Sequence, residues 1–473
     1  MKNFSIITLG CKVNQYESQQ IRELLEQIGL TQVETSKKSD LVVVNTCCVT
    51  GTASAKSRQY IRKAQRINPD AATIVCGCLP TIEIGELNVP AKNIHIVRHR
   101  DNLAAILTRM VNGTTTLPDL SAKRAADLQN TPIYKDTIIR PENDSKINCK
   151  NDLDNLPKLP QLTSFIDQTR AFLKVQDGCD GCCTYCIVPK TRPLVHSKPV
   201  RAALQEAQAL VEAGHREIVV TGIFLGAYGQ ESVRRKTWTG QQNDKLADLL
   251  DKMAEIPNLA RIRLSSLEPA DVTLRLVDTF CKHPNIMPHL HLSLQSGSDK
   301  VLKKMGRQYS ADEFRQKVAL VKSRLDRPAI TTDIIVGFPG ETDADFQQTI
   351  DLAKEVGFAK MHIFSFSPRK GTAAAVMQGA LDNRVIKERA HILRDLEVEL
   401  GRAFRQQFIG ETAEILVEND NGRVCGRSER YFMVYLAKSA KKPQRNEIVR
   451  AKLVENSKDG IIGEEQEHKC TGA

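Results

Sequence analysis

The feature that most constrains the fold of this chain is a regular alternation between apolar, β-rich runs and amphipathic helical segments. In the first 110 residues, each of three such runs is followed by a helical stretch: "FSIITLGC", "DLVVVNTCC" and "AATIVCGC". The first helical stretch, "YESQQIRELLEQIGL", has its leucines and isoleucines on one face and ends at Gly29, a residue type favoured at helix C-termini. Alternation of this kind predicts a parallel, doubly wound α/β sheet.

Cysteines lie at the end of each of these three runs. Cys11 ends the first run, Cys47 and Cys48 end the second, and Cys76 and Cys78 end the third. The carboxyl ends of parallel strands meet at one edge of a sheet, which is where such sheets bind ligands. We therefore expect one thiolate from each turn to converge on a single point. Sequence spacing does not decide between Cys47 and Cys48.

A second alternation begins after residue 168, with six runs: "AFLKVQ", "REIVVTG", "ARIRLSS", "HLHLSLQ", "AITTDIIVG" and "KMHIFSFS". Six βα units predict a closed or partly open parallel barrel of the TIM type, with its active face at the carboxyl ends of the strands. Beyond residue 405, runs that alternate at period two around Gly and Asn predict a small antiparallel β-barrel. The predicted domains are 1–111, a linker or insertion at 112–168 that lacks periodicity, the parallel barrel at 169–405, and the β-barrel at 406–473.

Charge and composition narrow the class of protein. The 473 residues carry a formal net charge of +11, which attracts polyanions and favours nucleic acid as a partner. No apolar run approaches the ~20 residues of a membrane-spanning helix, and the apolar start is too short for a secretory leader. Thirteen cysteines spread along the chain favour metal or redox chemistry in a reducing compartment over a disulfide framework. We therefore expect a cytoplasmic protein that does not contact a membrane.

The loop "GCDGCCTYCIVPK" at 178–190 contains four cysteines. Two abutting C-x2-C pairs would form a zinc site, but four-ligand zinc sites normally separate their pairs by a dozen or more residues. As a C-x3-C-x2-C pattern, the loop offers Cys179, Cys183 and Cys186 to an iron–sulfur cluster and leaves one iron without a protein ligand. The open iron could chelate a small molecule through an amine and a carboxylate. A zinc-stabilised, non-enzymatic RNA-binding protein remains the alternative.

This cysteine spacing, at the end of the first barrel strand, resembles that of the radical S-adenosylmethionine (SAM) superfamily. Seven further segments resemble methylthiotransferase motifs in the order of that family: "TLGCKVNQYES", "VVVNTCCVT", "VCGCLP", "LSSLEP", "HLHLSLQSGSDKVLKKMGRQYS", "DIIVGFPGET" and "FSFSPRKGT". The resemblance covers nearly the whole chain. It implies one 4Fe-4S cluster that cleaves SAM to a 5′-deoxyadenosyl radical and an auxiliary 4Fe-4S cluster that carries the sulfur to be donated. A second SAM would supply the methyl group, and the final β-barrel would be an RNA-binding TRAM domain.

The resemblance also implies which residues form the site. The auxiliary cluster ligands match Cys11, Cys47 and Cys78, and the ligands of the SAM-cleaving cluster match Cys179, Cys183 and Cys186. Beside them, three cysteines are expected to be spectators: Cys48, Cys76 and Cys182. The residues expected around SAM are Tyr185, Ser266, Glu268, Gln295, Arg307 and Gly337. Among these, the serine and the glutamate are also favoured by their place at the carboxyl end of a barrel strand.

Three features fall outside the matched motifs or depart from them. Phe224 stands where the family more often has asparagine, so a polar contact there is in doubt. The basic residues expected to contact RNA from the C-terminal β-barrel are Arg430, Lys438, Lys441, Lys442 and Arg445. Structural roles are expected for the ten histidines, which form no ligand pair at i, i+4, and for Cys281, Cys425 and Cys470.

Three branches of the family differ in substrate: isopentenyladenosine in tRNA, N6-threonylcarbamoyladenosine in tRNA, and an aspartate of a ribosomal protein. The segments "GCKVNQYES" and "HLHLSLQSGS" are most similar to the threonylcarbamoyl branch. The implied reaction replaces the C2 hydrogen of an adenosine beside the anticodon with a methylthio group. That bond is unactivated, so no general-base triad is expected. The implied partners are tRNA, an electron donor such as a flavodoxin-type protein, and a sulfur source.

Overall fold

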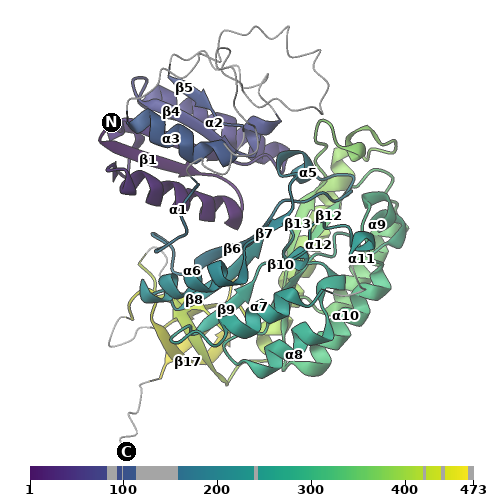
Figure 1. Cartoon of the computed structure of the whole chain (residues 1–473). Helices are drawn as coiled ribbons and strands as arrows, with labels where there is room; N and C mark the ends of the chain where they lie inside the picture. Colours follow the sequence, from purple (N-terminus) through teal and green to yellow (C-terminus); the bar gives the residue numbers. More distant parts are fainter. Residues whose placement is uncertain are drawn as a thin grey trace, which may run out of the picture. The chain divides into compact units, whose positions relative to one another are not determined.

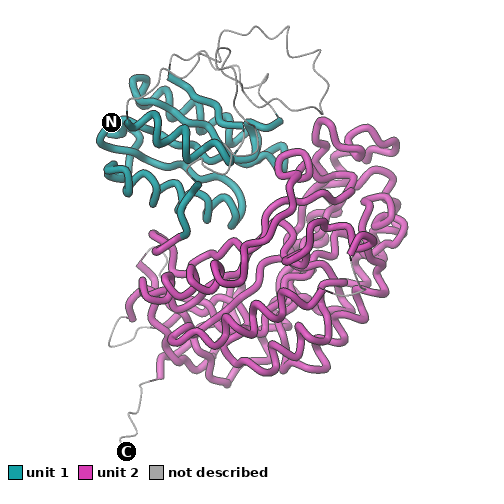
Figure 2. Tube along the Cα trace, in the orientation of Figure 1, with its two compact units in different colours: residues 1–161 teal, residues 162–473 magenta. Residues whose placement is uncertain are grey.

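The computed structural model describes residues 1–82, 93–98, 100–112, 158–238, 243–418, 422–437 and 443–466. The chain folds into two compact units, Met1–Gln161 and Leu162–Ala473 (Figure 2). Among the helices of the described residues, none combines the length and the apolar character that crossing a membrane requires.

The first unit is a parallel sheet with the strand order β2-β1-β3-β4-β5 (Figure 1). Its strands are β1 (Asn3–Thr8), β2 (Thr31–Gln32), β3 (Leu41–Thr46), β4 (Ala72–Gly77) and β5 (Ile94–Ile96). Its helices are α1 (Lys12–Gln27), α2 (Gly51–Ile67) and α3 (Leu103–Val111). The first helix therefore begins earlier than its apolar pattern alone indicated, directly after Cys11.

Helices cover both faces of this sheet. Leu25 of α1 and Leu107 of α3 lie in one apolar cluster with Val43 of β3. The residues on either side of Val43 along β3, Val42 and Val44, are also fully buried, and α2 packs against β3 and β4. A strand buried on both faces reads as a continuous apolar run, as "LVVV" does here. The predicted doubly wound arrangement is confirmed.

The second unit begins with a partly open parallel barrel. Its strands form two four-stranded sheets with the orders β7-β6-β8-β9 and β10-β11-β12-β13. The strands are β6 (Ala171–Asp177), β7 (His196–Ser197), β8 (Glu217–Gly222), β9 (Arg261–Leu264), β10 (Ser266–Leu267), β11 (His289–Leu292), β12 (Ala329–Val336) and β13 (Lys360–Ser365). The helices are α5 (Val188–Thr191), α6 (Val200–Glu212), α7 (Lys245–Met253), α8 (Leu274–Lys282), α9 (Asp299–Met305), α10 (Ala311–Arg324), α11 (Asp343–Val356) and α12 (Asn383–Gln406).

A closed barrel of five strands ends the chain, in the order β14-β15-β16-β18-β17. Its strands are β14 (Thr412–Val417), β15 (Cys425–Arg427), β16 (Met433–Leu436), β17 (Ile448–Asn456) and β18 (Ile461–Glu465). All pairs are antiparallel except β16 with β18, which the period-two pattern did not indicate. The barrel is consistent with a TRAM domain.

This β-barrel is docked against the amino ends of the parallel strands. Arg261 and Arg263, at the start of β9, donate to the backbone carbonyls of residues 427, 428 and 429 over 2.7–3.0 Å. Tyr431 stacks on His289, the first residue of β11, with ring centroids 4.5 Å apart. The carboxyl ends of the parallel strands therefore lie on the side of the parallel barrel opposite to the docked β-barrel. Active sites of parallel barrels lie at these carboxyl ends.

Candidate functional site

The three cysteine turns of the first unit lie at one edge of its sheet. Cys11 is the N-cap residue of α1 directly after β1, Cys47 follows β3, and Cys78 follows β4. These three strands are neighbours in the order β1-β3-β4. The arrangement is the one expected from the sequence.

Two glycines let these turns approach closely. Gly10 has a φ of +109°, and a Cβ on it would lie 2.8 Å from the Cβ and 3.1 Å from the Sγ of Cys47. Gly77 has a φ of +92°, and a Cβ on it would lie 2.4 Å from the carbonyl oxygen of Thr46. Only glycine fits at both places, because any side chain would push the turns apart. The sulfur of Cys47 therefore faces the turn that carries Cys11.

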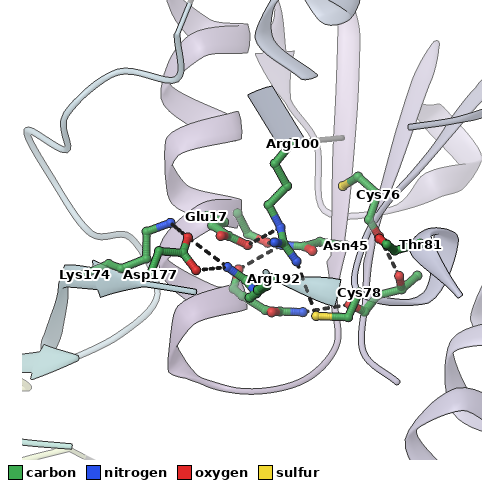
Figure 3. Close-up of polar contacts among 12 residues, drawn as sticks. Glu17, Asn45, Cys76, Cys78, Thr81, Arg100, Lys174, Asp177 and Arg192 are labelled. Carbon is green, nitrogen blue, oxygen red and sulfur yellow. Dashed lines mark hydrogen bonds and ion pairs between the residues drawn. The ribbon is translucent and has the colours of Figure 1, made fainter. Parts of the chain in front are cut away.

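Arg100 adds a positive charge beside the third cysteine (Figure 3). Its Nη2 lies 3.4 Å from the Sγ of Cys78, and its Nε lies 3.5 Å from a carboxylate oxygen of Glu17. A nearby cation stabilises a thiolate and so favours metal binding. Burial raises the pKa of Cys76, the neighbouring cysteine at the end of β4, to about 12. Arg100 had no signal in the sequence.

Cys47 and Cys48 are both buried, at 8% and 0% exposure, and the choice between them as a ligand stays a prediction. The backbone N–H and carbonyl of Cys47 both bond to the Ser57 hydroxyl, at 3.1 and 2.8 Å, which fixes this residue at the sheet edge. Cys48 is fully buried. The donor set of Cys11, Cys47 and Cys78 fits three irons of a cubane and leaves the fourth open.

The cysteine loop of the second unit follows β6. Gly178 has a φ of +79°, and a Cβ on it would lie 1.7 Å from the carbonyl oxygen of Leu194. The backbone N–H of Cys179 donates to the carbonyl of Arg192 over 2.8 Å, and the Arg192 guanidinium pairs with Asp177 at 2.7 Å (Figure 3). The loop is thus anchored where it leaves the strand.

The three cysteines of the pattern are partly buried in this loop, whereas Cys182 is exposed. Burial raises the pKa of Cys179 to about 12 and that of Cys186 to about 11. Both are thiols at neutral pH without a metal, so iron must displace their protons on binding. The backbone N–H of Gly181 also donates to the Sγ of Cys179 over 3.4 Å. This donor set, too, fits a cluster with one open iron.

Arg307 contacts three other residues expected at the site. Its Nη1 lies 3.3 Å from the Sγ of Cys183 and 3.4 Å from the hydroxyl of Tyr185. Its Nη2 forms an ion pair of 2.6 Å with Glu268. Hydrogen bonds to cluster sulfurs are one of the means by which proteins set reduction potentials. Arg307 therefore contacts both Glu268 and the sulfur of a loop cysteine.

Two residues that the sequence did not indicate support Glu268. Arg235 pairs with Glu268 and with Asp271, both at 2.6 Å. The backbone N–H of Glu268 donates to Asp271 over 2.8 Å. Burial raises the pKa of Asp271, and the charge of Arg235 counteracts that rise. Arg235 lies in the polar stretch "VRRKTW", where no periodicity predicts its fold, so only the structure reveals the contact.

The remaining expected SAM residues lie on the second sheet of the parallel barrel. Gln295 has a φ of +67° and bridges to Ile334 at the carboxyl end of β12. Such a backbone is uncommon in a residue other than glycine, and strain of this kind is often seen at functional sites. Gly337 follows β12, and its N–H donates to Glu341 over 2.8 Å. Ser266 is exposed on β10. These three residues lie in the same unit as Arg307.

The structure also places Phe224 and two of the basic residues that were expected to contact RNA. The ring of Phe224 lies 5.5 Å from the guanidinium of Arg235, so this position makes a cation–π contact where a polar side chain would make a hydrogen bond. Arg430 pairs with Asp326 at 3.0 Å, and Arg445 donates to the Thr169 hydroxyl over 2.9 Å. Three of the lysines expected to contact RNA lie outside the described residues: Lys438, Lys441 and Lys442.

The fold and the cysteine loop define a protein of the radical SAM class. Residues 173–353 match the Radical SAM superfamily, and residues 3–98 match the family described as "Uncharacterized protein family UPF0004". The fold is similar to that of the radical SAM methyltransferase TsrM from Kitasatospora setae, with a TM-score of 0.52. That match has 15% identity and covers 80% of this chain and 77% of the other.

Curated relatives extend the match over most of the chain. A threonylcarbamoyladenosine tRNA methylthiotransferase of Thermotoga maritima is 36% identical, covering 88% of this chain and 87% of its own. The protein of the same name from Bacillus subtilis is 33% identical, covering 88% and 85%. A tRNA-2-methylthio-N(6)-dimethylallyladenosine synthase of Pelotomaculum thermopropionicum is 30% identical, covering 90% and 89%. The chain belongs to the radical SAM tRNA methylthiotransferases, enzymes of sulfur and methyl transfer whose cofactors include SAM and a 4Fe-4S cluster.

Proposed function

We propose that this enzyme places a methylthio group on C2 of N6-threonylcarbamoyladenosine beside the anticodon of tRNA. The observation that carries the proposal is the 32–36% identity, over most of the chain, to three relatives that bear the name of this reaction. Relatives named for dimethylallyladenosine are 30–33% identical, so the base is the point to test. The cytoplasm, where tRNA is found, is the proposed location.

Two 4Fe-4S clusters are proposed, one on Cys179, Cys183 and Cys186, the other on Cys11, Cys47 and Cys78. When bound, the first supplies an electron to SAM and the second carries the sulfur that is transferred. Support for the auxiliary site comes from the three neighbouring turns, the glycine approach to Cys47, and the cation beside Cys78. An external electron donor, such as a flavodoxin-type protein, and a sulfur source complete the proposal.

The side chains of the SAM-cleaving site have separate tasks in this proposal. The loop cysteines bind iron, Arg307 offers N–H groups to the Cys183 sulfur, and Glu268 is held between Arg307 and Arg235. Tyr185 closes the apolar side of the site, because its ring meets that of Phe338 edge-on at 6.4 Å. No general base is needed, since the carbon–hydrogen bond is to be broken by a radical.

For tRNA binding, we propose that α2 contributes a basic face. The helix carries Lys56, Arg58, Arg62, Lys63 and Arg66 and contains no acidic residue. Four of these line a hollow of about 470 Å³ along the helix: Arg58, Arg62, Lys63 and Arg66. Cations spaced by one helical turn suit the phosphates of an RNA backbone. The β-barrel lysines at 438, 441 and 442 stay predicted contacts.

The test is anaerobic reconstitution followed by mass spectrometry of nucleosides from treated tRNA. Substrate tRNA carries either threonylcarbamoyladenosine or dimethylallyladenosine at the same position. A mass gain confined to the threonylcarbamoyl base supports the proposal, and a gain confined to the other base refutes it. Cys47→Ala should still produce 5′-deoxyadenosine but insert no sulfur, because it lacks only an auxiliary ligand. Normal methylthiolation by this variant would reject the second cluster as assigned.

A further inference from the structure

Three polar side chains of the second unit gather on three neighbouring strands of its second sheet, β11, β12 and β13. His291 on β11 pairs in register with Thr331 on β12, and Asp333 on β12 pairs with His362 on β13. Side chains alternate between the faces of a strand, so Thr331 and Asp333 share one face. The two histidines, which the sequence placed 71 positions apart (291 and 362), therefore lie on that same face of the sheet.

The ligating atoms of this trio are close enough to share an ion. One ligand atom each of His291, Asp333 and His362 lie within 4.8 Å of one another. The Nε2 of His291 is 3.3 Å from the Oδ2 of Asp333. Two ligands of a tetrahedral zinc ion with bonds of about 2.0–2.1 Å lie about 3.3 Å apart. The imidazole–carboxylate spacing therefore already matches one edge of such a tetrahedron.

The hydrogen bonding of His291 leaves its Nε2 atom available to bind a metal ion. Its Nδ1 lies 3.0 Å from the hydroxyl of Thr331. Its Nε2 is buried and makes no hydrogen bond within the described part of the chain. A proton on Nδ1, shared with the hydroxyl, leaves the lone pair on Nε2 directed toward the trio. An outer partner on one ring nitrogen is the usual arrangement of a metal-binding histidine.

We propose that His291, Asp333 and His362 bind one divalent cation of the zinc type, with a fourth position left for an oxygen ligand. Two imidazoles and one carboxylate favour zinc over magnesium or calcium, which prefer all-oxygen sites. The trio contains no thiolate, so it is distinct in its ligand chemistry from both cysteine sites. The alternative is a proton shared between His291 and Asp333 without any metal. This inference does not depend on the identity of the modified base.

The test uses the anaerobic enzyme with its clusters loaded, equilibrated with buffered zinc and then desalted. Zinc and iron per chain are measured by mass spectrometry, and the zinc shell by X-ray absorption. We expect about one zinc per chain with only nitrogen and oxygen neighbours. His362→Gln, an exposed position, should lower zinc occupancy at the same free zinc at least tenfold and leave iron unchanged. Asp333→Asn should do the same.

The matched control is His391→Gln, because His391 is also exposed and lies 3.5 Å from a carboxylate, that of Asp395. This variant should retain the zinc. Absence of zinc from the unaltered enzyme, or full retention in His362→Gln, overturns the proposal. So does a shell containing sulfur at about 2.3 Å, which would place the metal on the cysteines. None of these zinc measurements affects the test of which tRNA base is modified. The zinc proposal can therefore be rejected without rejecting the proposed function, and the reverse also holds.

Discussion

Cys182 and Cys183 are adjacent in the chain, yet their sulfurs have different surroundings. Cys182 is exposed, whereas the Sγ of Cys183 accepts a hydrogen bond from Arg307 over 3.3 Å. Gly306, at a φ of +73°, allows the chain before Arg307 to pass the carbonyl of Cys182. The C-x3-C-x2-C interpretation uses the second of these cysteines, and the zinc interpretation needs both.

Cys183→Ser should therefore reduce SAM cleavage to below about 1% of the unaltered enzyme, because the cluster loses one of three ligands. Cys182→Ser should retain full cleavage and full iron content. The measurement is 5′-deoxyadenosine formed with dithionite, together with iron per chain. Equal loss in both variants would contradict the assignment.

We expect Arg235 to be a positioning residue that acts through Glu268, because it pairs with both Glu268 and Asp271. Arg235→Gln leaves Glu268 with one cation and the buried Asp271 with none, so Glu268 loses its fixed place. We expect KM for SAM to rise about 10-fold, a loss of about 1.4 kcal/mol of binding, while kcat and iron content change little. Arg235→Lys should recover part of the loss.

The control for this prediction is Arg234→Gln. Arg234 is the neighbouring residue, its side chain is 48% exposed, and its partner is Asp180 at 3.6 Å rather than Glu268. An unchanged KM in Arg235→Gln, or an equal rise in Arg234→Gln, would show that Glu268 does not depend on this contact.

At the scale of elements, strands with strong apolar patterns were predictable and tertiary pairings were not. The runs before Cys11, Cys47 and Cys76 fold as parallel strands, as expected, because alternation with helices leaves few other topologies. The two-residue strand β7 and the parallel pairing of β16 with β18 carry no local pattern. Pairings of this kind depend on which distant segments come together in the fold, and no local sequence pattern indicates that.

The same distinction applies to the candidate site. The cysteines proposed as cluster ligands follow motifs with fixed spacing, so the sequence alone was enough to propose them. Arg100 and Arg235 each begin a short 3-10 helix in a segment without periodicity, and they lie 22 residues from Cys78 and 33 residues from Glu268. The proposed cation site also escaped notice, because its ligands come from three strands and not from one helix.

The basic face of α2 leads to a prediction for one element. Replacing Arg62, Lys63 and Arg66 with Gln should weaken tRNA binding and lower the slope of log K against log salt by about 2 to 3, for three lost phosphate contacts. The slope is measured by titration at several salt concentrations. Helix folding should be unaffected, because these side chains are exposed and Gln is a good helix former.

A matched control lies on α12, where Lys387, Arg394 and Arg402 are exposed among acidic residues of the same helix. The triple Gln variant there removes the same charge from the protein. If both variants lower the slope equally, the effect is one of net charge, and α2 is not a specific contact.

At the scale of the whole molecule, the cysteine loop and the C-terminal β-barrel lie at opposite ends of the parallel barrel. The cysteine loop follows the carboxyl end of β6, whereas the C-terminal β-barrel contacts the amino ends of β9 and β11. Arg430, expected to contact RNA, donates to Asp326 and lies over the ring of Phe408 at 4.7 Å. This arginine therefore also serves the docking of the two domains.

Tyr431 lies at the centre of that docking. Its ring stacks on His289, lies 5.0 Å from the guanidinium of Arg263, and its hydroxyl accepts from Arg170 over 2.9 Å. Aromatic stacking and cation–π contacts of this kind contribute roughly 0.5–2 kcal/mol each. Tyr431→Ala should weaken docking by about 2 kcal/mol. The population of the undocked form then rises about 30-fold.

Limited proteolysis of residues 407–411, between α12 and β14, measures this population, because cleavage follows the open form when opening is fast. Cleavage should therefore be about 30-fold faster in Tyr431→Ala, with cluster iron retained. Tyr60→Ala, a partly buried tyrosine on α2, is the control and should cleave at the original rate. If Tyr431→Ala is cleaved at the original rate, Tyr431 does not contribute to docking. The hydrogen bonds from Arg261 and Arg263 to the backbone carbonyls then hold the β-barrel in place, and replacing both arginines together is the experiment that tests this.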